Sequence, residues 1–178
     1  YTDMNAIRRD EEMDNLHSIY VDQWDWEKNI SKDDRNIDYL KNTVKRIVLC
    51  LSETKKHINR MFPSLKLEFC EDVYFITTEE LLKRYPNLSS KEREDAICKE
   101  YKTVFLIGIG DKLSNGKVHD KRAPDYDDWK LNGDILIWYE PLNRAVEISS
   151  MGIRVDKESL LYQLNETNAL DRKNLPFH

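Results

Sequence analysis

Hydrophobic residues recur every three, four or seven positions between residues 38 and 62, which is the spacing of one face of an α-helix. The stripe consists of Leu40, Val44, Ile47, Leu51, Ile58 and Met61. Basic side chains occupy the opposite side, and Pro63 follows the segment. Because proline cannot continue a helix, the pattern predicts one long amphipathic helix that ends before residue 63.

Three further helices are predicted from the residues at their ends. The expected ranges are 78–84, 89–101 and a last helix that begins after Asp156. Ser89 can accept a hydrogen bond from the first turn of its helix, and Glu92 can answer three residues later, as in a capping box. Asp156 is likewise a residue type that favours the position before a helix.

Between the helices, apolar residues alternate with polar ones or run continuously, which predicts strands. The expected strands are 18–26, 65–69, 73–76, 103–109, 134–139 and 145–150. The last two are joined by residues 140–143, a connection short enough for antiparallel neighbours. Because strands and helices do not alternate regularly, the order favours a single α+β domain with a mainly antiparallel sheet flanked by helices.

Charge, hydropathy and cysteine spacing exclude several classes of function. The 178 residues include 28 Lys and Arg against 33 Asp and Glu, a formal charge of −5, which argues against a generic nucleic-acid partner. No apolar run reaches the roughly 18 residues of a membrane span, so a cytoplasmic protein without a membrane partner is expected. The three cysteines form no C-x-x-C pair and are expected to be reduced, partly buried thiols rather than zinc ligands.

Glycine is rare, with five residues, and neither a Walker loop nor a complete dinucleotide fingerprint is present. A nucleotide would therefore have to be bound by arginines and carboxylates. Arg8 is followed by Asp10 and Glu11, an arrangement that is either a surface salt-bridge cluster or a fixed guanidinium for a phosphate or carboxylate. The sequence alone leaves both interpretations open.

The predicted strand 18–26 becomes polar along one side. Ile19, Val21, Gln23 and Asp25 alternate with their neighbours and are expected to share that side. The strand end could simply be exposed. Alternatively, it forms a polar floor that receives an ammonium group and a carbonyl or amide.

A third polar group lies in the two C-terminal strands. Glu147 and Ser149 are expected to share a face, and Gly152 permits a bulge or a close approach of the backbone. If the strands pair as a hairpin, Asp134 and Glu147 could face one Mg²⁺ ion, although two acids on adjacent strands also occur by chance. In the acidic loop 122–129, Asp127 could bind an amine or be merely solvated.

Four long segments together resemble the aspartate–ammonia ligases, the ammonia-dependent asparagine synthetases, which are related to the catalytic core of aspartyl-tRNA synthetase. The segments are His17–Glu27, Ala123–Trp129, Leu131–Trp138 and Glu147–Asp156. The resemblance implies a class II aminoacyl-tRNA synthetase-like fold and a homodimer. The implied reaction is ATP-dependent amidation of L-aspartate with ammonia through a β-aspartyl-adenylate, with release of AMP and pyrophosphate.

The resemblance also implies roles for individual residues. Arg8 is the expected catalytic residue, at the α-phosphate of ATP. The expected substrate-binding residues are Gln23, Asp25, Asp127, Ser149 and Arg154. The expected ATP-binding residues are Arg8, Leu16, Val21, Asp134, Glu147 and Ser150, of which Asp134 and Glu147 would also hold Mg²⁺. Arg154 is expected to hold the α-carboxylate of aspartate, because the side-chain carboxylate is the one that reacts.

The sequence departs from the family pattern in three places. The family's first motif would lie before Tyr1, its glycine-rich third motif would lie after His178, and the join at 129–131 is shorter than the family's loop. The chain is therefore expected to be part of a longer protein. Two alternatives stay open: a synthetase-like protein that transfers aspartate to tRNA, and a non-catalytic module that binds aspartate or a nucleotide.

Overall fold

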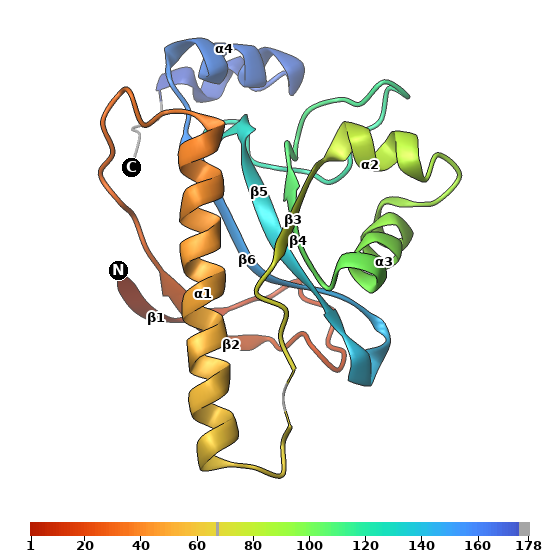
Figure 1. Ribbon diagram of the computed structural model, residues 1–178. Helices are drawn as coiled ribbons and strands as arrows, with labels where there is room; N and C mark the ends of the chain where they lie inside the picture. The colour runs from red at the N-terminus through yellow and green to blue at the C-terminus, as the bar shows by residue number, and fades with distance from the viewer. Residues whose placement is uncertain (67, 175–178) are drawn as a thin grey trace. The chain divides into compact units, whose positions relative to one another are not determined.

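The computed structural model describes residues 1–66 and 68–174, and it divides the chain into two compact units. The first unit is Tyr1–Arg35, and the second begins at Asn36. Figure 1 shows the strands and helices that each unit contains. The two units are described one after the other.

The first unit is built on a two-stranded antiparallel ribbon. Strand β1, Thr2–Ile7, pairs with β2, Tyr20–Asp25. Strand β2 confirms the strand expected at 18–26, whereas β1 was not predicted: three of its six residues are polar and five are exposed. Since side chains alternate along β2, Val21, Gln23 and Asp25 share one face of the ribbon, as expected.

The second unit contains a four-stranded sheet in the order β3-β4-β5-β6. The strands are β3 Val73–Thr77, β4 Thr103–Ile107, β5 Asp127–Tyr139 and β6 Arg144–Arg154. The strands β3 and β4 run parallel, and the other two pairs are antiparallel. The sheet is therefore mixed: two of its three pairs are antiparallel, and the parallel pair was not expected. Two helices lie between β3 and β4 in sequence, and this crossover returns the chain in the same direction.

Two strand predictions need correction. Strand β5 begins at Asp127 rather than at residue 134, because polar residues at its start pair with β6 and hide the strand pattern. The strand expected at 65–69 is absent at residues 65, 66, 68 and 69, and residue 67 lies outside the described residues.

The four helices agree closely with the predictions. They are α1 Ile37–Met61, α2 Thr78–Arg84, α3 Ser90–Tyr101 and α4 Lys157–Glu166. Two short 3₁₀ helices, η1 Glu140–Leu142 and η2 Leu170–Asn174, were not predicted. The capping box of Ser89 and Glu92 is present, and Asp156 caps α4 with its carboxylate on the amides of Glu158 and Ser159.

Helices cover both faces of the sheet, with α1 along one side and α2 and α3 along the other (Figure 1). Every residue of β4 is buried. Val104 and Leu106 pack with Leu81 of α2 and Ile97 of α3. Phe105 points to the opposite face, where its ring meets Phe75 edge-on. This burial fixes β4 and its neighbour β5, on which several candidate site residues lie.

Within residues 1–66 and 68–174, no helix combines the length and the apolar character that a membrane span needs. The three cysteines are free thiols, as expected. Cys98 is buried and Cys70 is half-buried, whereas Cys50 is exposed.

Candidate functional site

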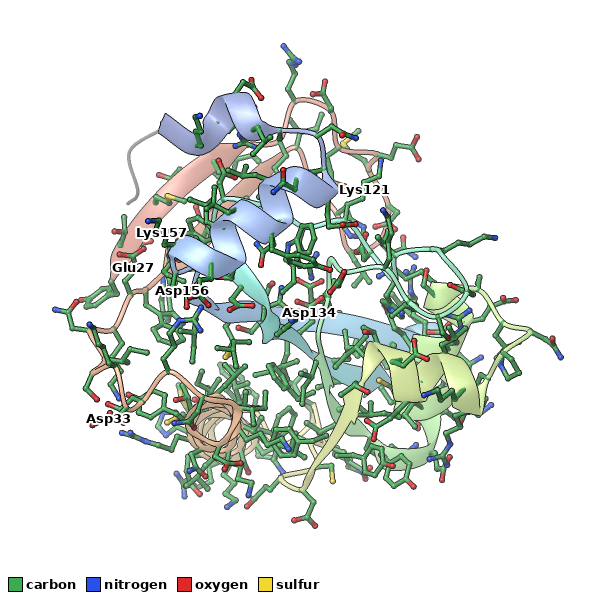
Figure 2. All side chains as sticks on the ribbon, turned by 90° about the horizontal axis from the view of Figure 1, so that it is seen from above. Glu27, Asp33, Lys121, Asp134, Asp156 and Lys157 are labelled. Carbon is green, nitrogen blue, oxygen red and sulfur yellow. The ribbon has the colours of Figure 1, made fainter. Side chains whose placement is uncertain are left out.

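Two carboxylates of the β5–β6 hairpin lie on the same face of the sheet. Asp134 is opposite Ser150, and Leu136, two residues further along β5, is opposite Glu147. Because residues two apart on a strand share a face, Asp134 and Glu147 both face the side that α3 covers. Asp134 is buried, and Figure 2 shows it in the interior of the sheet unit. Glu147 keeps solvent access.

A β-bulge in β6 produces this arrangement. The register shifts between Ile135, which is opposite Ser149, and the next pair, so Ile148 is an extra residue. Ser149 consequently lies with Ile135 on the α1 side, and Glu147 lies on the other side. The expectation that Glu147 and Ser149 share a face is therefore wrong, because regular alternation does not account for an inserted residue.

The pKa of each of the two carboxylates is raised. Burial is the main cause that raises the pKa of Asp134. The surrounding protein also reduces the hydration of Glu147 and raises its pKa, and the nearby charge of Asp134 acts in the same direction. Arg122 opposes both shifts and forms an ion pair with Asp134 Oδ2 through Nη2. Arg122 therefore balances two acids that would otherwise repel each other.

A second layer of charged residues supports this group from α3 and from the loop before β5. The His119 Nε2 atom lies 2.9 Å from Glu94 Oε1, and both side chains are buried. Lys91 Nζ donates to the other oxygen, Oε2, of Glu94 at 3.0 Å. Glu94 in turn raises the pKa of Asp134 and Glu147. This layer ties the loop that carries Arg122 to helix α3.

Sequence reasoning missed Arg122, Glu94 and His119 as members of this group. Arg122 is the first residue of the acidic loop that was singled out, but its partner Asp134 lies twelve residues further on. Glu94 and His119 are 25 residues apart. No local spacing signals such a contact, because only the fold brings α3 against the loop.

A second cluster forms where β5 begins and β6 ends. Asp127 is opposite Arg154 in the ladder, and Arg154 Nη1 donates to Asp127 Oδ1 at 2.5 Å. The Arg154 guanidinium carbon also lies 3.3 Å from the centre of the Tyr126 ring, in cation–π contact. The side chains of Asp127 and Arg154 are partly exposed. Sequence analysis expected both residues in the substrate site, and the fold places them side by side.

Gly152 makes room for this second cluster. A Cβ atom at position 152 would lie 2.7 Å from Cβ and Cγ of Asp127 and 2.8 Å from Cβ of Asn132. These distances are shorter than ordinary van der Waals contact. The close approach that the glycine was expected to permit is therefore present, and its neighbour is Asp127.

The ribbon of the first unit brings together two further candidates. Arg8 Nη2 donates to Gln23 Oε1 at 3.4 Å, and the Arg8 amide donates to the carbonyl of Ile19 at 2.7 Å. The Asp25 carboxylate accepts the amide of Trp26 at 2.9 Å. The ribbon thus presents a guanidinium, an amide and a carboxylate.

Leu16 lies in the connection between β1 and β2, in a turn closed by Asp14. The amides of Leu16 and His17 donate to Asp14 Oδ1 at 2.7 and 2.8 Å. These hydrogen bonds, together with the His17 side chain, lower the pKa of Asp14 to about 2. The turn therefore depends on an ionised carboxylate.

The carboxylates of Asp134 and Glu147 meet only part of what a hard cation such as Mg²⁺ requires. Among residues 1–66 and 68–174, no group of three or more His, Cys, Asp or Glu side chains is arranged to hold a metal ion. Asp134 Oδ1 is buried without a hydrogen-bond partner among those residues. Mg²⁺ commonly takes one or two protein carboxylates and completes its octahedron with phosphates and water. The two carboxylates of Asp134 and Glu147 are compatible in number with that pattern.

Comparison with known proteins identifies a family that the chain matches. The family model described as aspartate-ammonia ligase matches residues 1–178. Aspartate–ammonia ligases from Clostridium tetani and Lactobacillus johnsonii are 61% and 60% identical to the chain over its whole length. One from Clostridium perfringens is also 60% identical. The chain covers 52% of the Clostridium tetani protein and 53% of the other two, so it spans about half the length of these relatives.

Proposed function

Because this chain belongs to the aspartate–ammonia ligase family, we propose that it supplies aspartate- and ATP-binding residues of an enzyme that makes L-asparagine. The reaction consumes L-aspartate, ATP and ammonia, and releases AMP and pyrophosphate. The observation that carries the proposal is the adjacent Asp127–Arg154 pair. An acid beside an arginine complements the ammonium and the carboxylate of a free amino acid.

The chemistry requires activation of the aspartate side chain. A carboxylate is a poor acyl donor, because its leaving group would be oxide. In the first step a side-chain carboxylate oxygen bonds to the α-phosphorus of ATP, and pyrophosphate leaves. In the second step ammonia attacks the acyl carbon and loses a proton, and AMP leaves with the electron pair of the broken C–O bond.

Arg8 is the proposed catalytic residue of the first step. A guanidinium at the α-phosphate neutralises the charge that develops on the transferring group, an electrostatic effect worth about 3 kcal/mol when one such donor is removed in other enzymes. The hydrogen bond to Gln23 holds the Arg8 side chain beside the polar face of the ribbon. Gln23 on that face would bind a carbonyl oxygen of the substrate, and Asp25 would bind its ammonium group.

Asp127 and Arg154 would bind the backbone groups of aspartate. Their ion pair already holds each side chain in place, which lowers the entropy lost when the substrate binds. Arg154 would hold the α-carboxylate, and the reacting side-chain carboxylate would remain free for adenylation. Proximity of the bound groups then favours the attack by ammonia.

Asp134 and Glu147 are the residues that would hold Mg²⁺, with Leu16, Val21 and Ser150 contributing to the ATP site. When bound, the cation would neutralise phosphate charge and favour departure of pyrophosphate. The support for this part is the shared face of the two acids and the unpartnered oxygen of Asp134. Ser149 lies on the other side of the sheet, so Ser150 is the serine that shares this face.

The resemblance to class II aminoacyl-tRNA synthetases extends the proposal to the whole protein. We infer a synthetase-like catalytic core, a homodimer and a cytoplasmic location. The α+β architecture, with helices on both faces of an open sheet, is compatible with such a core. The family name supports the reaction.

The test is a product assay on the intact protein with aspartate, ATP and Mg²⁺, with either ammonium or glutamine. We expect AMP and asparagine in equal amounts, with ammonium as the nitrogen donor. Formation of ADP, or AMP release without any dependence on ammonium, would contradict the proposal. Transfer of aspartate to tRNA would support the synthetase-like alternative instead.

A pair of variants of β2 tests the ribbon residues. Asp25→Asn should weaken aspartate binding in calorimetry by at least about tenfold, because a charged hydrogen bond contributes roughly 1.5–3 kcal/mol. Asp22→Asn is the matched control, since Asp22 lies on the opposite face of the same strand. Equal affinity in both variants would remove Asp25 from the site.

A further inference from the structure

The side-chain amide of Gln163 in α4 forms three hydrogen bonds with the main chain of one short segment. Its side chain is 1% exposed. Oε1 accepts the amide N–H of Trp129 at 2.9 Å, and Nε2 donates to the carbonyls of Pro124 at 2.9 Å and Asp127 at 3.0 Å. Both hydrogens of the side-chain amide and its oxygen are therefore engaged within residues 124–129.

This segment leads into β5 and includes the first three residues of the strand, Asp127 among them. A buried amide that bonds three main-chain groups fixes their positions relative to one another, because each unmade bond would leave a buried polar atom without a partner. Arg172 of η2 adds a second tie, since its Nη2 lies 2.6 Å from Asp125 Oδ2. The segment is thus held from the α4–η2 side, while Arg154 of β6 holds the Asp127 side chain.

Helix α4 is itself firmly placed. Leu160 and Leu164 are buried, and the capping box of Asp156 and Ser159 closes its first turn. Figure 2 shows where α4 begins, at Asp156 and Lys157. Gln163 therefore projects from a fixed helix, and its hydrogen bonds transmit that position to the main chain of Asp127.

We propose that Gln163 is a positioning residue for amino-acid binding: it places the main chain of Asp127 so that the Asp127 carboxylate meets Arg154 in the geometry that receives aspartate. The inference rests on the proposed function, because the roles of Asp127 and Arg154 in binding aspartate belong to that proposal. Gln163 itself acts only through the main chain of residues 124–129.

Two variants of the intact protein separate the hydrogen bonds. Gln163→Leu removes all three. Gln163→Glu keeps an oxygen that can accept the Trp129 amide, but an ionised carboxylate cannot donate to the carbonyls of Pro124 and Asp127. The matched control is Leu161→Ala, which shortens an exposed side chain of the same helix and leaves the amide of Gln163 in place.

The first measurement is hydrogen–deuterium exchange of the peptide that contains residues 124–130. We expect faster exchange in both Gln163 variants than in Leu161→Ala. The second measurement is steady-state kinetics. A misplacement of about 1 Å can cost up to a hundredfold, so the KM for aspartate should rise about tenfold or more in both variants, with the KM for ATP changed less than about twofold. The control should keep both KM values.

The outcomes are distinct. Faster exchange together with a selective rise in the KM for aspartate supports the proposal. Unchanged exchange, or an equal loss for both substrates, overturns it while the proposed function stands. If the wild-type protein forms no AMP with aspartate and ammonium, the proposed function fails, and this inference fails with it.

Discussion

Arg154 donates to the Asp127 carboxylate across the β5–β6 ladder, and its guanidinium also stacks on the Tyr126 ring. Each of the two charged groups thus has its position set before any substrate arrives. An arginine held by both an acid and an aromatic face loses little freedom when it binds a carboxylate. The variants of these two residues are therefore the most direct test of the amino-acid site.

We expect Asp127→Asn and Arg154→Lys each to raise the KM for aspartate about tenfold or more. Asparagine removes the negative charge, and lysine cannot reproduce the planar fork of the guanidinium. The KM for ATP should change much less in steady-state assays of the intact protein. Arg144→Lys is the control, because Arg144 is exposed at the far end of β6. Equal losses for aspartate and ATP would argue against a specific role.

Gly152→Ala should disturb Asp127 without touching any charged group. The new methyl group would overlap Asp127 and Asn132, and such overpacking costs roughly 1–3 kcal/mol. We expect a lower free energy of unfolding and a higher KM for aspartate. Gly116→Ala is the control, because Gly116 has a φ of +76° but no atom within 4 Å of an added Cβ. Alanine there costs roughly 1–2 kcal/mol from the backbone alone and should leave the KM unchanged.

Removal of Arg122 should lower the free energy of unfolding, because the acid that it pairs with would remain buried without a cation. Arg122→Gln leaves Asp134 buried without its cation, and breaking a buried ion pair in this way costs about 3 kcal/mol. Adding Asp134→Asn to the same protein should recover at least about 1 kcal/mol in urea unfolding without Mg²⁺. Arg9→Gln is the control, since the exposed pair of Arg9 and Asp10 should contribute less than about 1 kcal/mol. No recovery in the double variant would contradict the coupling.

The turn at Asp14 should loosen in acid. Its folded-state pKa is lowered to about 2 from 3.8, chiefly by the amides of Leu16 and His17. The stabilisation is therefore fully present above pH 3.8 and is lost as the pH falls through about 2. Carbon NMR of the Asp14 carboxyl should report this titration, and the amide shifts of Leu16 and His17 should follow it. A midpoint near 3.8 would show that the turn does not depend on the ionised acid.

The sequence was most informative about the helices. Pro63 ends the long helical pattern, and Ser89 with Glu92 and Asp156 mark helix starts that local chemistry alone determines. These signals act within three or four residues, so a single sequence contains them.

Features that depend on contacts between distant elements could not be predicted in the same way. The parallel pairing of β3 and β4 follows from a crossover through two helices, and the sequence alone gives no register for it. The bulge at Ile148 changed the face of Glu147 relative to Ser149. Arg122 was not expected in the carboxylate group, because its partner is chosen by the fold of the loop before β5.

Regular pairing along β6 would have turned Glu147 toward the α1 side, away from Asp134. The extra residue Ile148 therefore divides β6 into two halves. Side chains alternate regularly between the two faces of the sheet within each half, but the alternation is shifted by one residue from one half to the other. Deletion of Ile148 would leave both halves in their present register and keep Glu147 across from Leu136. Deletion of a residue further along, at 151 or 152, would instead move the residues between the deletion and Ile148 to the opposite face, so tolerance to single-residue deletions should fall with distance from Ile148.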